Sequence, residues 1–229
     1  MRKAHLFPAC CLLSAILLIG GKPDSENPLS LIKNGDFSQA DSTDTNKPAY
    51  WDKPDELGIQ WVNVPTSQEG TGQTKAIRMN TALSEKAMMD QWKKMGIEKW
   101  NIPHATDGPV GGTYGLSFYS DAISVRTDQA YRLTFKFKGK SGGAKVWIRG
   151  YGRLRGKERR LYDTIVNCRP EGDDWTTFSQ AFNPTANTPD VTCIRVMLFA
   201  YWPPALYWFK DVAITPISQE EWKLEISEN

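Results

Sequence analysis

The chain has 229 residues, of which 40% are hydrophobic and 24% are charged, and its formal net charge at pH 7 is only +2. This length predicts one domain of β-sandwich size or slightly more, and nine Trp residues among the apolar set make a sizeable core available. Pro and Gly are frequent and amphipathic helical patterns are few. This composition argues against a mainly helical protein and favours an all-β chain with many turns.

Residues 1–21 have the features of a secretory signal peptide. Arg2 and Lys3 precede an apolar run, Leu6–Ile19, and cleavage is expected near Gly20–Lys22. The run is too short for a comfortable membrane span. The residues at the expected cleavage site are imperfect, so an uncleaved anchor is the alternative. We expect a secreted, periplasmic or cell-envelope protein with no stable membrane span.

Cleavage would change the charge and the cysteine content of the chain. The formal charge would fall from +2 to zero, and residues 22–28 would form a polar linker. Cys10 and Cys11 lie inside the apolar run, at the wrong place for lipid attachment. Cys168 and Cys193 remain, and export predicts a disulfide between them. The alternative is two buried free thiols on separate strands.

From residue 29 onward the chain shows about ten β-strand patterns. Strands at this spacing, separated by turns rich in Gly, Pro and Asn, predict a two-sheet sandwich or jelly roll over residues 29–216. The expected strands are Leu29–Lys33, Ile59–Val64, Thr74–Asn80, Thr113–Tyr119, Ala122–Val125, Tyr131–Lys138, Ala144–Arg153, Leu161–Asn167, Trp175–Phe182, Val191–Tyr201 and Ala205–Thr215.

Helical patterns occur at two places. Residues 83–100 predict one helix, capped by Ser84 and ended by Gly96, as an insertion that covers one rim of the sandwich. Its apolar stripe favours packing over ligand binding. The C-terminal tail, 217–229, begins with a capping-box pattern at Ser218 that predicts one turn of helix.

The strand Ala144–Arg153 has two unlike faces, because side chains alternate along a strand. One face suits a core and consists of Val146, Ile148, Gly150 and Gly152. The other consists of Trp147, Arg149, Tyr151 and Arg153. Aromatic rings interleaved with guanidinium groups indicate a surface that binds something flat and polar. The alternative is an ordinary sandwich face on which Arg stems cover exposed rings.

The strand Val191–Tyr201 offers a similar face, with Arg195 and Tyr201, and Trp202 follows in a proline-rich corner. Met197 and Phe199 share that face, so the alternative is that this side is core with Arg195 at its edge. The candidate ligand-binding residues are Trp147, Arg149, Tyr151, Arg153, Arg195, Tyr201 and Trp202.

Positive charge is concentrated in one part of the chain. Residues 132–160 contain eleven Lys and Arg and a single acid, Glu158. Such an excess attracts anions, although residues 153–160 also read as a solvated loop with no partner. Export and the lack of a nucleic-acid-binding motif argue against nucleic acid. An acidic or sulfated polysaccharide, or an anionic cell envelope, fits better.

Catalytic motifs are missing from the sequence. His104 is the one histidine after the signal peptide, and no nucleophile elbow, P-loop, zinc motif or metalloprotease motif is present. Glu158 and Asp163 lie near each other in the chain, but this spacing is weak support for a glycosidase pair. We therefore expect no catalytic residues. A small glycoside hydrolase and a structural, protein-binding sandwich of the envelope are the alternatives.

Four segments of the chain carry a resemblance to a known family. The segments are LIKNGDFSQ at Leu31–Gln39 with Trp51 downstream, DQAYRLTFKFKG at Asp128–Gly139, WTTFSQAF at Trp175–Phe182 and LYWFKDVAI at Leu206–Ile214. Each segment alone is unspecific, but together, over residues 29–216 and in the same order, they resemble family 4/9-type carbohydrate-binding modules. These modules are galactose-binding-like jelly rolls often attached to xylanases and glucanases.

The resemblance implies a non-catalytic protein that binds a polysaccharide by stacking sugar rings on Trp and Tyr, in partnership with a polysaccharide-degrading enzyme or the envelope. It also implies a structural calcium between the first and last strands, for which Asp36 and Asp211 remain as ligands. The family's neighbouring acidic residue is replaced by Ser38, and its closing Asp-Asn pair by Lys210 and Asp211. The alternative is that Asp36 only caps a turn.

Overall fold

The computed structural model describes residues 30–65, 72–97, 102–170 and 172–227. The expected signal peptide (1–21), the linker (22–28) and the two cysteines at positions 10 and 11 lie outside the described residues. Among the described residues, no helix combines the length and apolar character that a membrane span requires.

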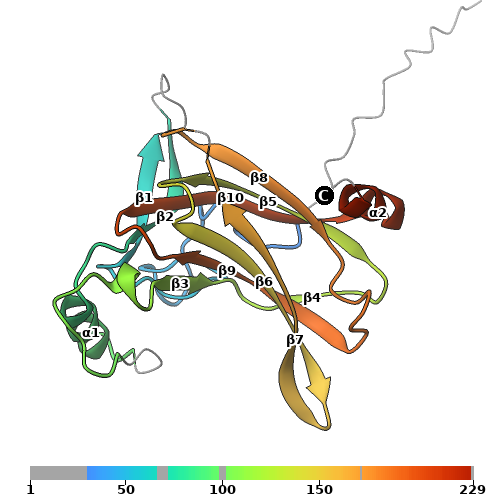
Figure 1. Ribbon diagram of the computed structural model, residues 1–229, viewed down its shortest axis with the longest axis horizontal. Coiled ribbons are helices and arrows are strands. Elements are labelled where there is room, and N and C mark those ends of the chain that lie inside the picture. Colours follow the sequence, from blue (N-terminus) through green and yellow to red (C-terminus); the bar gives the residue numbers. More distant parts are fainter. Residues whose placement is uncertain (1–29, 66–71, 98–101, 171, 228–229) are drawn as a thin grey trace, which may run out of the picture.

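The fold is an all-β, two-sheet sandwich of the jelly-roll type, as the sequence predicts (Figure 1). One antiparallel sheet has the order β1-β2-β10-β5-β8, and the other has the order β3-β9-β6-β7 with β4 also pairing with β9. The strands are β1 (Ile59–Pro65), β2 (Gln73–Asn80), β3 (Leu116–Tyr119), β4 (Ile123–Ser124), β5 (Ala130–Lys138), β6 (Ala144–Leu154), β7 (Lys157–Cys168), β8 (Thr176–Phe182), β9 (Val191–Ala200) and β10 (Leu206–Ile217).

The core lies between the two sheets and follows the period-2 pattern of the strands. On β5, Leu133 and Phe137 are fully buried, and on β6 so are Val146 and Ile148. Phe137 packs edge-on or tilted against rings from neighbouring strands, including Phe209 at 5.2 Å between centroids. Each such side chain stabilises the fold by about 1.5–3 kcal/mol relative to an exposed one.

The N-terminal segment differs from the expected strand at residues 29–33. Its described part is not a regular strand, because a turn with positive φ at Asn34 follows at once. The segment nevertheless runs beside β10. The Leu31 amide donates to the Ile214 carbonyl at 2.7 Å, and the Val212 amide donates to the Gly35 carbonyl at 2.9 Å. It therefore continues along the edge of β10 beyond the residues that pair with β2.

The first helix, α1 (Glu85–Lys94), begins at the predicted cap and is shorter than residues 83–100. The Ser84 hydroxyl accepts a hydrogen bond from the Ala87 amide at 3.2 Å. Asp55 attaches the helix to the sandwich, since its carboxylate accepts from the Trp92 indole at 3.0 Å and from the Ile59 amide at 2.7 Å. Burial raises the pKa of Asp55, and these hydrogen bonds oppose the rise.

The second helix, α2 (Gln219–Ser227), is longer than the single turn expected from the sequence. The Ser218 hydroxyl accepts from the Glu221 amide at 3.1 Å, as the capping pattern predicts. Arg132 on β5 forms ion pairs with Glu221 and Glu225 at 2.7 and 2.8 Å. The helix therefore lies against the outer side of β5 and β8 (Figure 1).

The expected disulfide is wrong. Cys168 and Cys193 are both free thiols. Cys168 is paired with Ala144 at one end of β6, and Cys193 is paired with Tyr151 seven residues further along the same strand. This separation corresponds to about 23 Å, whereas a disulfide requires Cα atoms within about 7 Å.

We expect alkylation of the denatured, unreduced protein to label both Cys168 and Cys193, because neither thiol has a partner within reach. Peptide mass spectrometry reads the result. In the native protein Cys168 should react much more slowly than Cys193, since burial raises the pKa of the Cys168 thiol and blocks access to it. A cross-linked peptide that contains both residues would contradict the structure.

Candidate functional site

The second sheet carries a continuous outer surface that we call the platform. It is formed by the side chains of β3, β9 and β6 that point away from the core. Most of them are half-buried, and Met197 is buried by its neighbours. The platform consists of Tyr119, Lys145, Trp147, Arg149, Tyr151, Arg195, Met197 and Phe199.

Strand pairing arranges the platform in rows across the sheet. Trp147 is paired with Met197, and Met197 is paired on its other side with Tyr119. In the next row Arg149 is paired with Arg195. Successive rows on one face are two residues apart, about 6.6 Å along the strand, which lets long side chains of one row reach those of the next.

Arg149 is held in place by three neighbours. Its Nη1 donates to the Tyr119 hydroxyl at 2.9 Å, and its guanidinium carbon lies 5.2 Å from the centroid of the Trp147 ring. Its Nε lies 3.7 Å from an oxygen of Asp163 on β7. These contacts fix the plane of the guanidinium over the aromatic surface.

Arg195 is held in a similar way from the other side of Tyr119. Its Nε donates to the Ser120 carbonyl at 2.7 Å, and its Nη2 lies 3.5 Å from an oxygen of Asp52. Its guanidinium carbon is 5.0 Å from the centroid of the Tyr119 ring. Burial raises the pKa of Tyr119, although both arginines oppose the rise, so the hydroxyl stays protonated at neutral pH.

Three buried polar atoms of the described residues have no hydrogen-bond partner, and all three belong to the outer side of this sheet. They are the Ser117 hydroxyl, the Trp147 indole nitrogen and the Arg149 Nε. An unsatisfied buried polar group costs about 1–3 kcal/mol, so native proteins rarely keep several of them together. The concentration of these atoms at the platform distinguishes it from the rest of the described surface.

The structure brings most of the predicted ligand-binding residues to this surface. Trp147, Arg149, Tyr151 and Arg195 lie together on the platform. Tyr201 lies beyond the end of β9, with its ring stacked on Phe199 at 5.5 Å between centroids.

Two predicted residues lie beyond the platform. Trp202 is 57% exposed in the corner between β9 and β10. Arg153 lies on the β6–β7 hairpin beyond the last pair that β6 forms with β9.

The alternative that places Met197 and Phe199 on the core side is wrong, because Val196 and Leu198 fill the core from the opposite face of β9. Sequence analysis missed Tyr119 and Lys145. Lys145 lies 5.2 Å from the Tyr201 ring centroid, and Tyr119 links the two arginines. The alternation of residues 116–119 was the one available signal for Tyr119.

Asp36 and Asp211, the residues expected to bind calcium, each have a partner within the protein. Asp36 accepts from the Ser38 amide at 3.2 Å and from the Ser38 hydroxyl at 3.1 Å, which is the turn-capping alternative. Asp211 forms an ion pair with Lys136 at 3.0 Å. The described part of the chain contains no group of three or more His, Cys, Asp or Glu side chains arranged to hold a metal. Calcium normally takes six to eight oxygen ligands.

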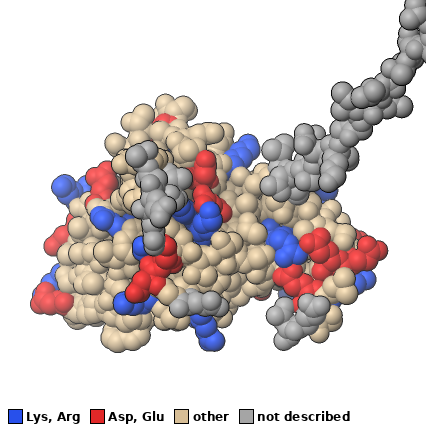
Figure 2. All heavy atoms as spheres, turned by 90° about the horizontal axis from the view of Figure 1, so that it is seen from above, with Lys and Arg blue, Asp and Glu red and all other residues tan. Residues whose placement is uncertain are grey.

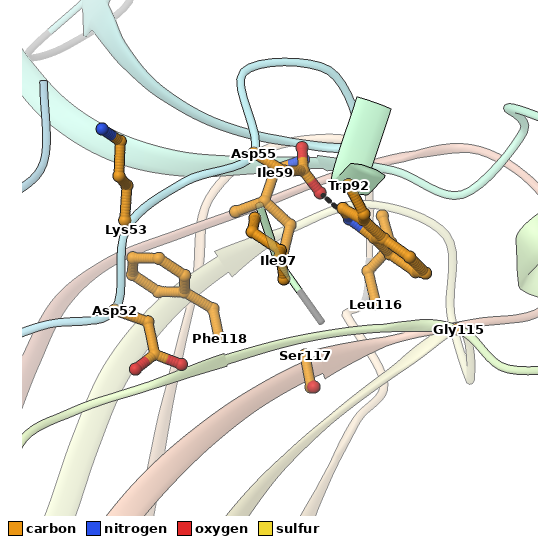
Figure 3. Close-up of a pocket in the computed structure, with 10 residues that line it drawn as sticks. All are labelled: Asp52, Lys53, Asp55, Ile59, Trp92, Ile97, Gly115, Leu116, Ser117 and Phe118. Carbon is orange, nitrogen blue, oxygen red and sulfur yellow. Dashed lines mark hydrogen bonds between the residues drawn. The ribbon is translucent and has the colours of Figure 1, made fainter. Parts of the chain in front are cut away.

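A small cavity of about 140 Å³ lies between α1, β3 and the segment before β1 (Figure 3). Its walls are mainly apolar, with Trp92, Leu116 and Phe118 among them. Asp55 lines it, but its carboxylate oxygens already accept hydrogen bonds from Trp92 and from backbone amides. Lys53 and Asp52 point away from the apolar walls (Figure 3). Asp55 therefore serves to hold α1 in place.

The other candidate catalytic groups are either engaged in ion pairs or located in different parts of the fold. Asp163 is held by Arg149 and Arg160, while Glu158 lies on the hairpin opposite Arg153. His104 is exposed in the loop after α1. These positions do not assemble an acid–base pair.

No known protein family and no curated protein matches the chain at the level of sequence. Solved structures that resemble it include the enzymatically active domain of tailspike protein 4 of bacteriophage CBA120, with 9% identity and a TM-score of 0.49. That match covers 82% of this chain and 21% of the tailspike chain, so this chain spans about a fifth of its length.

Carbohydrate-binding modules recur among the similar structures. The family 16 carbohydrate-binding module 2 is 16% identical, with a TM-score of 0.43 over 81% of this chain and 99% of that chain. TmCBM61, in complex with β-1,4-galactotriose, is 14% identical, with a TM-score of 0.44 over 82% and 99%. Modules of families 4 and 22 also occur. The resemblance to the family 4/9 type in particular stays a prediction.

We expect thermal unfolding to be the same in excess EGTA and in excess calcium, because Lys136 occupies the position beside Asp211 where a cation would be needed. Circular dichroism measures the midpoint. The variant Lys136→Gln removes the competing ammonium and serves as the control. A higher midpoint in calcium for the natural sequence would show that calcium binds despite the Lys136–Asp211 ion pair, and it would support the calcium prediction.

Proposed function

We propose that this chain is a secreted, non-catalytic carbohydrate-binding protein whose platform binds a polysaccharide. The observation that carries the proposal is the fixed arrangement of Trp147, Tyr119 and Tyr151 around Arg149 and Arg195. In this role the protein would hold a polysaccharide-degrading enzyme or the cell envelope to the glycan.

The platform offers the two kinds of contact that a sugar requires. The flatter face of a sugar ring presents C–H groups that pack on the electron-rich face of an aromatic ring. The hydroxyl groups at the ring's edge accept hydrogen bonds from planar donors such as guanidinium. On the platform these donors lie beside the rings of Trp147 and Tyr119 rather than on a separate loop.

Preorganisation supports the same proposal. The guanidinium groups of Arg149 and Arg195 are oriented by Tyr119, Ser120 and nearby carboxylates, so little side-chain entropy would be lost when a ligand binds. The Trp147 indole nitrogen is buried without a hydrogen-bond partner among the described residues, and a ligand oxygen would satisfy it once the ring turns outward.

The length of the surface favours a chain of sugars over a single one. Arg195 and Tyr201 are separated by six residue steps along or just beyond β9, which corresponds to about 20 Å. Aromatic side chains occur at both ends and in the middle of this distance: Tyr119 beside Arg195, Phe199 between, and Tyr201 at the far end. A polysaccharide would contact all of them at once.

We expect Trp147→Ala and Tyr151→Ala to weaken polysaccharide binding by about two- to tenfold each, because a lost stacking contact removes about 0.5–1.5 kcal/mol. Affinity electrophoresis against a panel of neutral and acidic polysaccharides identifies a ligand, and titration calorimetry measures the change. Trp208→Ala is the matched control, since Trp208 is half-buried on the first sheet and should not affect binding.

Two other outcomes would overturn the proposal. Reducing sugar released from any retained polysaccharide would show a glycoside hydrolase. No retention of any glycan, together with a cross-linked protein partner, would show a structural sandwich of the envelope. Unchanged retention of both platform variants would refute the site.

A further inference from the structure

The hairpin between β6 and β7 extends beyond the sandwich. Pairing between β6 and β9 ends at Gly152 and Val191, whereas pairing between β6 and β7 continues to Leu154 and Lys157. The hairpin projects from the lower edge of the molecule (Figure 1). Its residues 153–160, which we call the basic hairpin, are all exposed.

The basic hairpin is a regular ribbon rather than an irregular loop. Arg155 and Gly156 form a two-residue turn in which both have positive φ, 51° and 75°. Such turns match the right-handed twist of the flanking strands and join them without a gap in the pairing. The charged side chains are therefore attached to a defined backbone.

The basic hairpin carries five cations and one acid. Arg160 forms an ion pair with Asp163 at 3.2 Å, and Arg153 lies opposite Glu158. Within the described residues, Arg153, Arg155, Lys157 and Arg159 take part in no ion pair. Like charges at this spacing repel one another, and this repulsion is relieved when an anion binds between them.

Elsewhere on the described surface, acids lie among the cations. Lys47, Lys53 and Lys86 each form an ion pair with an aspartate, at 2.7–3.4 Å. The face seen from above mixes acidic and basic side chains (Figure 2). The basic hairpin differs because its residues 153–160 hold five cations and the single acid Glu158.

The basic hairpin is also continuous with the platform. Tyr151 is paired with Arg160, which shares Asp163 with Arg149. Arg153 follows Tyr151 by two residues and Arg160 is the partner of Tyr151 across the ribbon, so both lie on the platform side of the hairpin. Lys157 and Arg159 are paired with Leu154 and Gly152 and lie on the opposite side. From Arg149 to the turn at Arg155 the distance along the strand is about 20 Å.

We propose that Arg153 and Arg160, on the platform side of the basic hairpin, bind the carboxylate or sulfate groups of the polysaccharide that lies on the platform, so that the ligand is an acidic polysaccharide. This inference rests on the proposed function of the platform. Guanidinium groups form paired hydrogen bonds with planar carboxylates and with sulfate oxygens, which makes arginine suited to this contact.

Other polyanionic partners fit less well. Leu154 is the only large apolar side chain on the basic hairpin, so the hairpin has no apolar face to insert into a membrane. Strong nucleic-acid binding draws on a broad positive surface, whereas this chain has a net formal charge of only +2.

The test compares two double variants with the same change in net charge. The first is Arg153→Gln and Arg160→Gln on the platform side of the basic hairpin. The control is Lys93→Gln and Lys94→Gln, which are exposed positions on α1. All four positions are at the surface, so both variants should fold, and circular dichroism checks that they do.

We expect the hairpin variant to bind polygalacturonate or chondroitin sulfate at least about tenfold more weakly at low salt, with a smaller difference at high salt because counterions screen the contact. The control variant should bind within about twofold of the natural sequence. Comparison of the two polymers shows whether carboxylate or sulfate is preferred. Binding to neutral galactan or hydroxyethylcellulose should not change.

The remaining outcomes separate this inference from the proposed function. Equal binding of both double variants to every acidic polymer, with binding still lost in Trp147→Ala, would overturn the inference and leave the platform standing. Acidic-polymer binding that depends on the hairpin but not on Trp147 would overturn the platform. Loss of binding to a single-stranded oligonucleotide alone would overturn the inference in favour of nucleic acid.

Discussion

The two-faced side-chain pattern of β6 is the constraint on which the platform depends. This strand lies between β9 and β7, with Val146 and Ile148 in the core and Trp147 and Arg149 on the outer side. A shift of the pairing by one residue would turn Arg149 into the core, where an unpaired charge costs several kcal/mol. The contrast between the two faces therefore sets the register of the sheet and the positions of the outer side chains together.

Arg149 and Arg195 are paired across the sheet and would repel each other without neighbouring acids. The order of the platform therefore depends on the carboxylates that surround them. Asp163 comes from the neighbouring strand β7, but Asp52 comes from the long loop before β1. That loop is held by Trp51, which is 1% exposed and stacks on Phe118 at 5.8 Å between centroids. Packing of one core indole thus places the carboxylate that neutralises Arg195.

The sequence predicted those features that depend on alternation within one strand. The outward faces of β6 and β9 follow from residues two apart, so the side occupied by Trp147 and Arg149 was predictable. Features that depend on which strands become neighbours could not be predicted from the sequence. Tyr119 joins the site because β3 pairs with β9. The disulfide expectation failed because Cys168 on β7 and Cys193 on β9 are paired with β6 residues seven positions apart. The spacing of residues along the sequence reveals neither the β3–β9 pairing nor the distance between the two cysteines.

The direction of the basic hairpin is also a product of strand pairing. Irregular pairing interrupts both edges of β6 at nearly the same height, between Gly150 and Tyr151 on one side and between Tyr151 and Gly152 on the other. Such irregularities increase the local twist and redirect a strand. At Gly152 a Cβ atom would lie 1.9 Å from the Asp190 carbonyl oxygen, so only glycine lets the strand pass the loop before β9. The hairpin therefore leaves the sandwich at a point that the backbone specifies, directly beyond Tyr151, and Arg153 and Arg160 on one side of it continue the platform.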